Sequence, residues 1–268
     1  MKKMIALALS CIIVTGSVVT GFAQQLEEDI SVVSEETKND IEESINEIDE
    51  EDIFEHLTYE DMEDIEKEIM QYISENPNVT DEDLDQFSLN MMKEKAEHNI
   101  LYNPLADGYQ WLEASDYEKQ YMKEHPRETP SYTYCSNMAN SEAKSRYTNN
   151  SLWYNGNGDA FRHVFWSSAL VKRFHDVLNY DLSESQDASE RWTDVHEPPN
   201  DRGSLASRMD VQNNTLGRES LAPSTYKKDG YAEMVKQAQN YIDIGLAYRI
   251  QEIDGRDKIV STDDTEKK

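Results

Sequence analysis

Three short segments between residues 159 and 218 carry polar side chains whose types and spacing suit metal binding or proton transfer. Carboxylates and imidazoles are ligands of zinc and of harder divalent ions, and they also act as general acids and bases. Arginine can hold a phosphate or carboxylate group, and asparagine can orient a substrate or stabilise an oxyanion. The candidate residues are Asp159, Arg162, His163 and Trp166, then His196 and Glu197, and finally Asp210, Asn213, Asn214 and Arg218.

Two chemical roles are open for the carboxylates and imidazoles. In an acid–base site, His163 and His196 would act as general base and acid, and Glu197 and Asp210 are the further catalytic candidates. In a metal site, the same region would hold a divalent ion such as zinc, although His196-Glu197 is not part of an HExxH zinc motif. The candidate metal ligands are Asp159, His163, His196 and Asp210.

The remaining candidates would bind the substrate. Arg162 or Arg218 would hold an anionic group, and Asn213 and Asn214 would orient the substrate. Trp166 lies on the same predicted helical face as Arg162 and is included with them. A structural interpretation stays open beside this one, because a buried hydrogen-bond network that fixes a core would use the same residue types.

A helix over residues 159–174 must position the first group. Its four polar candidates are spaced i, i+3, i+4 and i+7, which places them on one helical face. Apolar residues occupy the other sides, as is typical of a buried helix.

Two further helices must supply the other groups. Ser183-x-x-Gln186 predicts the start of the second helix and Pro198-Pro199 its end, so His196 is expected at the C-terminus. Ser204 predicts the start of the third helix. Two consecutive asparagines inside that helix oppose helix propensity, which favours a site at this place over a scaffold.

The motifs follow one another as Asp159-x-x-Arg162-His163-x-x-Trp166, His196-Glu197 and Met209-Asp210-x-x-Asn213-Asn214-x-x-x-Arg218. This set resembles a bacterial family of unknown function whose members include small secreted proteins and C-terminal modules of toxin-like proteins. The resemblance covers roughly residues 100–250. It implies an all-helical domain in an exported protein with these positions as the site, and it implies no particular reaction.

The N-terminus has the pattern of a secretory signal peptide. Lys2 and Lys3 precede an apolar stretch, and Gly21-Phe22-Ala23 supplies the small residues of a cleavage site. Cleavage near Ala23 would give a secreted or cell-envelope protein without a transmembrane span. The mature chain would then keep only Cys135, which excludes an intramolecular disulfide.

The chain has 268 residues and a formal net charge of −28, and most of that charge lies in one segment. Residues 24–97 hold 27 acidic and four basic side chains. Such an excess disfavours nucleic acid as a partner, because phosphate binding needs Lys and Arg. The argument is weaker for the rest of the chain, which is only mildly acidic. The segment is expected to be a helical or partly disordered extension, either solvated or bound to a partner.

The sequence also predicts several helix boundaries. Thr58-x-x-Asp61 and Ser115-x-x-Glu118 predict capping boxes, and Thr80 predicts a further helix start. Residues 127–158 are polar and are expected to be a loop. A last helix is expected over about residues 229–253, followed by a frayed charged tail.

These patterns predict an all-α protein with a compact helical domain behind the acidic extension. The expected parts are a signal peptide (1–23), the extension (24–100), a helical catalytic domain (101–255) and a charged tail (256–268). The first functional hypothesis is a secreted hydrolase, metal-dependent or acid–base, that acts on a phosphoester or another cell-envelope substrate. The alternative is a non-catalytic binding module with a protein partner, whose polar cluster is structural.

Overall fold

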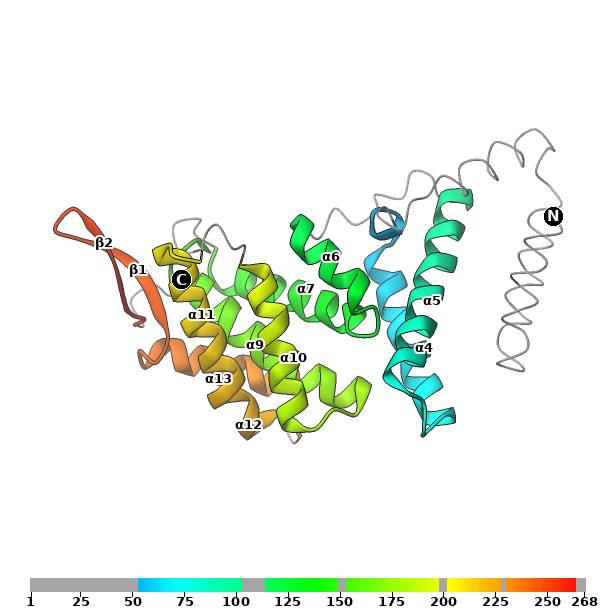
Figure 1. Ribbon diagram of the computed structural model, residues 1–268. Coiled ribbons are helices and arrows are strands. Elements are labelled where there is room, and N and C mark those ends of the chain that lie inside the picture. Colours follow the sequence, from blue (N-terminus) through cyan, green and yellow to red (C-terminus); the bar gives the residue numbers. More distant parts are fainter. Residues whose placement is uncertain (1–52, 103–113, 149–152, 198–201, 228–229, 264–268) are drawn as a thin grey trace, which may run out of the picture. The chain divides into compact units, whose positions relative to one another are not determined.

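The computed structural model describes residues 53–102, 114–148, 153–197, 202–227 and 230–263, and most of these residues are helical (Figure 1). The all-α prediction is therefore confirmed, with one small β-hairpin added. The expected signal peptide and residues 24–52 lie outside the described residues. None of the described helices is long and apolar enough to cross a membrane.

The first part of the fold runs to residue 146 and the second contains the candidate site. The first part consists of the short helix η1 (Ile53–His56), α4 (Tyr59–Glu75), α5 (Asp81–Tyr102), α6 (Asp116–Glu124) and α7 (Thr129–Arg146). The second part consists of α9 (Asn157–Leu178), α10 (Leu182–His196), α11 (Leu205–Leu216), the π-helical turn η2 (Gly217–Leu221), α12 (Ala222–Thr225), α13 (Tyr231–Asp243), β1 (Tyr248–Ile253) and β2 (Arg256–Ser261).

Helix α9 is the centre of the domain. It packs against α7, α10, α11 and α13, which lie around it in Figure 1. Apolar side chains on several of its sides are fully buried, as the all-round apolar pattern predicts. Because its first turns also carry Asp159 and His163, this buried helix places polar groups inside the fold. The fully buried apolar residues include Phe161, Val164, Phe165, Leu170 and Phe174.

Helix starts agree well with the capping signals. Both predicted capping boxes form, from Thr58 to Asp61 and from Ser115 to Glu118. Thr80 accepts a hydrogen bond from the Asp83 backbone at the start of α5. The prediction for α10 is wrong by two residues.

The N-cap of α10 is Asp181, which forms a capping box with Glu184, instead of the predicted Ser183 and Gln186. Asp181 is as good an N-cap as serine, and the pair three residues apart has the required geometry. The predicted position of His196 as the last residue of this helix is unaffected.

The expected loop over 127–158 is wrong, because α7 occupies most of it. Pro130 fits the first turn, where no intrahelical N–H bond is lost. The Ser131 hydroxyl donates a hydrogen bond to Glu66, and the Thr133 hydroxyl donates one to the Pro130 carbonyl. Both hydroxyl groups therefore keep a hydrogen-bond partner although they are buried. Tertiary packing outweighs a helix propensity that is weak for Ser, Thr, Asn and Tyr.

The last predicted helix is also wrong in its second half, and the expected frayed tail is partly ordered. Helix α13 ends at Asp243, and the chain turns through Gly245, whose φ is +77°. Residues 248–261 then form an antiparallel hairpin with Tyr248 opposite Ser261. The turn contains Gly255, also at positive φ. The last part of the apolar pattern that predicted a helix therefore lies in strand β1.

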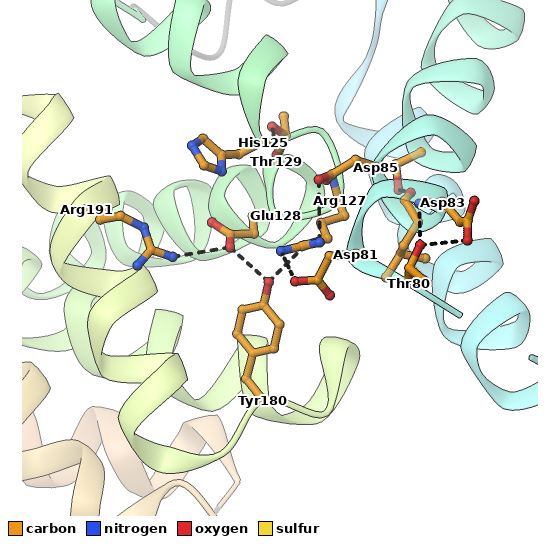
Figure 2. Close-up of polar contacts among 12 residues, drawn as sticks. Thr80, Asp81, Asp83, Asp85, His125, Arg127, Glu128, Thr129, Tyr180 and Arg191 are labelled. Carbon is orange, nitrogen blue, oxygen red and sulfur yellow. Dashed lines mark hydrogen bonds and ion pairs between the residues drawn. The ribbon is translucent and has the colours of Figure 1, made fainter. Parts of the chain in front are cut away.

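The described part of the acidic segment packs onto the rest of the domain through ion pairs, one of which is buried. Glu66 of α4 pairs with the Arg173 guanidinium of α9 and is almost fully buried. On α5, Asp81 and Asp85 pair with Arg127, as Figure 2 shows. Helices α4 and α5 therefore belong to the compact unit Ile53–Lys268.

Gly217 lies where two helices approach closely. A Cβ atom added there would lie 2.1 Å from the Val164 carbonyl oxygen and 2.2 Å from the Ser167 hydroxyl. The backbone of Gly217 is right-handed, so the absent side chain and not an unusual φ explains the glycine. This contact holds α11 and η2 against α9 and so sets the distance between Asp210 and His163.

Candidate metal centre

The first turns of α9 hold Asp159 in a defined position. Asp159 Oδ2 accepts a hydrogen bond of 2.9 Å from the backbone N–H of Asn155. Asp159 Oδ1 accepts bonds from Arg162 Nε and Nη2, at 3.1 and 2.8 Å. Burial alone would raise the pKa of Asp159, but Arg162, with the Asn155 N–H, lowers it below its usual value. Asp159 is therefore an ionised carboxylate inside the fold.

His163 is fully buried and its orientation is set by α11. Its Nδ1 lies 3.1 Å from Asn214 Oδ1, which can only accept a hydrogen bond. The Nδ1 atom therefore carries the proton, and Nε2 carries the lone pair. Burial, with the nearby Arg162, lowers the pKa of His163 well below its ordinary value, so the imidazole is neutral. A neutral imidazole with a fixed tautomer is the form that binds a metal.

Asp210 faces His163 from α11. Its Oδ1 lies 3.1 Å from His163 Nε2 and receives no hydrogen bond among the described residues. Two lone pairs at this distance repel each other unless a proton or a cation lies between them. Burial, together with Asp159 and Glu197, raises the pKa of Asp210 to about 8. The contact therefore calls for positive charge. The Arg162 guanidinium supplies it at Nε2, and a proton or a metal ion would supply it at Oδ1.

Together Asp159, His163 and Asp210 could hold a metal ion, since one ligand atom from each lies within 4.8 Å of the other two. Two carboxylate oxygens and one imidazole nitrogen suit zinc or a harder divalent ion. Three protein ligands leave coordination positions for water or substrate, which distinguishes catalytic from structural zinc sites. Asn214 is the outer partner that orients the imidazole.

The charge around these ligands is negative. Arg162 bridges Asp159 and His163 Nε2, the latter at 2.6 Å. It is the positive group that faces Asp159, Asp210 and Glu197, and all three raise its pKa. Burial raises the pKa of Glu197. A divalent ion would balance the carboxylates and free Arg162 to bind an anionic substrate.

His196 lies beside this group but outside it. Its ring centroid is 6.2 Å from that of His163 and 5.0 Å from that of Trp166. Its Nδ1 bonds to Glu118 Oε1 at 2.8 Å instead of reaching the ligand atoms. The structure thus places three of the four candidate ligands together and gives His196 a different partner.

Two predicted substrate-binding residues point elsewhere. Asn213 forms two hydrogen bonds of 2.9 Å with the backbone of Tyr248 and so holds the start of β1. Arg218 pairs with Glu190 and Glu219, at 3.3 and 3.5 Å. Both side chains are buried in these structural contacts.

The comparisons with known proteins add a family match. Residues 119–243 match a domain of unknown function, DUF6973. The DUF6973 region includes all ten candidate residues and supports the prediction of a domain of unknown function. No curated protein and no solved structure matches the chain. The secretion and the reaction of the DUF6973 region stay predictions.

Sequence reasoning assigned no chemistry to Glu118, which lies one residue before the DUF6973 region. Its capping box with Ser115 was visible in the sequence, but the contact with His196 spans 78 residues. A glutamate at the third position of a helix is usually solvated. The signal that it is unusual here is its burial, which only the structure supplies.

Proposed function

We propose that the domain is a metal-dependent hydrolase in which Asp159, His163 and Asp210 bind a divalent ion. The proposal rests on the contact between His163 Nε2 and Asp210 Oδ1, which are 3.1 Å apart. Asn214 keeps the His163 proton on Nδ1, so Nε2 can bind a metal ion. Zinc is the first ion to test because it accepts mixed nitrogen and oxygen ligands.

The substrate class follows from Arg162. Its guanidinium lies at the ligand group and matches a phosphate oxygen pair bidentately. A metal ion would neutralise charge on the same phosphoryl group and assist attack by water. We infer that the substrate is a phosphoester. The signal-peptide pattern would place this reaction outside the cytoplasm, where cell-envelope phosphoesters are available.

The test is metal binding by the purified full chain, measured by calorimetry with Zn²⁺ and Mn²⁺. Asp210→Asn removes one ligand charge with little change of shape, so the variant should fold and lose binding. His175→Ala, on α9 but outside the site, should bind as wild type does. Wild-type protein that binds neither ion, or Asp210→Asn protein that binds both, would exclude this function.

A structural hydrogen-bond network is the second candidate, and one contact favours it. Arg162 already satisfies both Asp159 Oδ1 and His163 Nε2 without a metal. In that case the wild type would bind no ion and would not hydrolyse bis(p-nitrophenyl) phosphate at any metal concentration. A metal hydrolase would instead show ester hydrolysis that depends on added metal and is lost in Asp210→Asn.

A further inference from the structure

Beside the metal centre, His196 and Glu118 form a carboxylate–imidazole pair. The Nδ1 of His196 and Oε1 of Glu118 are 2.8 Å apart, so the carboxylate accepts the Nδ1 proton. This contact leaves Nε2 on the opposite side of the ring, and no hydrogen bond to Nε2 occurs within the described ranges. The His196 side chain keeps 32% of its surface exposed, so part of the ring is in contact with solvent.

Glu118 is fixed from three sides. Its Oε2 accepts hydrogen bonds of 2.7 and 2.9 Å from the backbone N–H and hydroxyl of Ser115. The Tyr132 hydroxyl donates to its Oε1, the atom that also faces His196. Although burial opposes ionisation, His196 leads the contacts that lower the pKa of Glu118 to about 2. The imidazole is therefore held by a rigid, charged carboxylate.

Helix capping does not explain this burial. A capping-box glutamate fulfils its role while exposed to water, and Asp181–Glu184 in α10 is an exposed example. Only 2% of Glu118 is exposed, and burying a carboxylate is costly unless a partner compensates. Ser115, Tyr132 and His196 all compensate this cost, and His196 contributes most. The burial of Glu118 therefore depends on the orientation of the His196 ring.

The ring lies next to the proposed reaction site without binding the ion. His196 is 6.2 Å from His163, ring centroid to ring centroid, and Trp166 packs edge-on against it at 5.0 Å. A group bound at the Asp159, His163 and Asp210 ligands would therefore have His196 as a neighbour.

We propose that His196 is the catalytic acid of the hydrolase and that Glu118 is its positioning residue. This inference rests on the proposed function. Water attacks phosphorus while the bond to the leaving oxygen breaks, and its electron pair goes to that oxygen. The Nε2 proton of the imidazolium moves to the same oxygen, which releases an alcohol. The proton lost by the attacking water restores the imidazolium through solvent.

Leaving-group dependence tests the pair, because a general acid matters most when the leaving group is basic. We compare hydrolysis of bis(p-nitrophenyl) phosphate with that of the phenyl and methyl diesters, using the metal-loaded full chain. His196→Ala should reduce hydrolysis of the phenyl and methyl diesters about 10²–10⁴-fold, with a much smaller loss on the nitrophenyl diester. Added imidazole should restore part of the loss.

Glu118→Gln should show the same pattern with a smaller loss, since the amide can still accept the Nδ1 proton but carries no charge. Ser115→Ala is the matched control: it removes the hydroxyl bonds between Ser115 and Glu118, but keeps the backbone N–H bond to Glu118 Oε2 and the His196 contact. This control should lower stability without changing the leaving-group dependence.

The outcomes separate the two proposals. If His196→Ala retains metal and loses the same factor on all three diesters, the acid role is refuted while the hydrolase function stands. If Glu118→Gln follows the Ser115→Ala control, the positioning role is refuted. Wild-type protein that hydrolyses none of the diesters at any metal concentration overturns both proposals.

Discussion

The Nδ1 of His163 and the Oδ1 of Asn214 are 3.1 Å apart, although the two residues are 51 positions apart in the chain. This contact keeps the proton on Nδ1, because an amide oxygen cannot donate one. It therefore directs the Nε2 lone pair of His163 toward Asp210 and connects α9 to α11 at the candidate metal centre.

Asn214→Ala should weaken Zn²⁺ binding about 10–100-fold, the usual effect of losing an outer partner of a metal-binding histidine. Without the amide oxygen, the imidazole can place its proton on Nε2 and turn away. Competition against a zinc-sensitive dye measures the affinity. An unchanged affinity would show that Asn214 does not orient His163.

Asn213→Ala should affect the hairpin and not the metal centre. The variant loses two hydrogen bonds to the Tyr248 backbone, worth about 0.5–1.5 kcal/mol each. Amide hydrogen exchange should become faster in β1 and β2, while Zn²⁺ affinity stays close to that of wild type. Equal exchange rates in variant and wild type would contradict the role of Asn213 in holding β1.

Gly217→Ala should destabilise the fold by about 1–3 kcal/mol, the range for adding a methyl group to a close-packed contact. The new Cβ would collide with the Val164 carbonyl and the Ser167 hydroxyl. Gly203→Ala is the control, because nothing lies within 4 Å of its added Cβ. Urea unfolding of both variants measures the difference, and equal stabilities would mean that the two helices can separate without cost.

Glu118→Gln should make stability less sensitive to acid. Because the pKa of Glu118 is lowered to about 2 in the fold, the unfolded chain binds its proton more readily between about pH 2 and the usual value of 4.5. The Glu118 contribution is present above pH 4.5 and is lost as the pH falls through this range. Urea unfolding from pH 5 to pH 2.5 should give a smaller slope for the variant. Parallel slopes would rule out an ionised Glu118.

Glu66→Ala should cost about 3–5 kcal/mol, since it leaves the Arg173 guanidinium without its buried partner. A double variant, Glu66→Leu with Arg173→Met, should recover much of this stability because neither charge is left alone. Lys67→Ala, which breaks an exposed pair with Asp64, is the control and should change little. A Glu66→Ala variant as stable as this control would show that the Glu66–Arg173 pair contributes little to the fold.

Local signals in the sequence determined most helix starts and the helical class. Capping side chains and apolar spacing act within a few residues, so the starts at Ser115 and Ser204 and the polar face of α9 could be predicted directly. The same limits explain the failures. In α7, polar residues are helical because they form hydrogen bonds with distant residues such as Glu66. Strand β1 is held by hydrogen bonds to Asn213, 35 residues earlier.

The candidate site was predicted as a set of residues, and only the tertiary structure divided that set. Sequence spacing put Asp159 and His163 on one face, but the approach of α11 at Gly217 decides that Asp210 and Asn214 reach them. Long-range contacts likewise assign His196 to Glu118 and Arg218 to Glu190. The physical reason is that a side chain's partner depends on how helices cross, and crossing distances depend on packing that no single segment encodes.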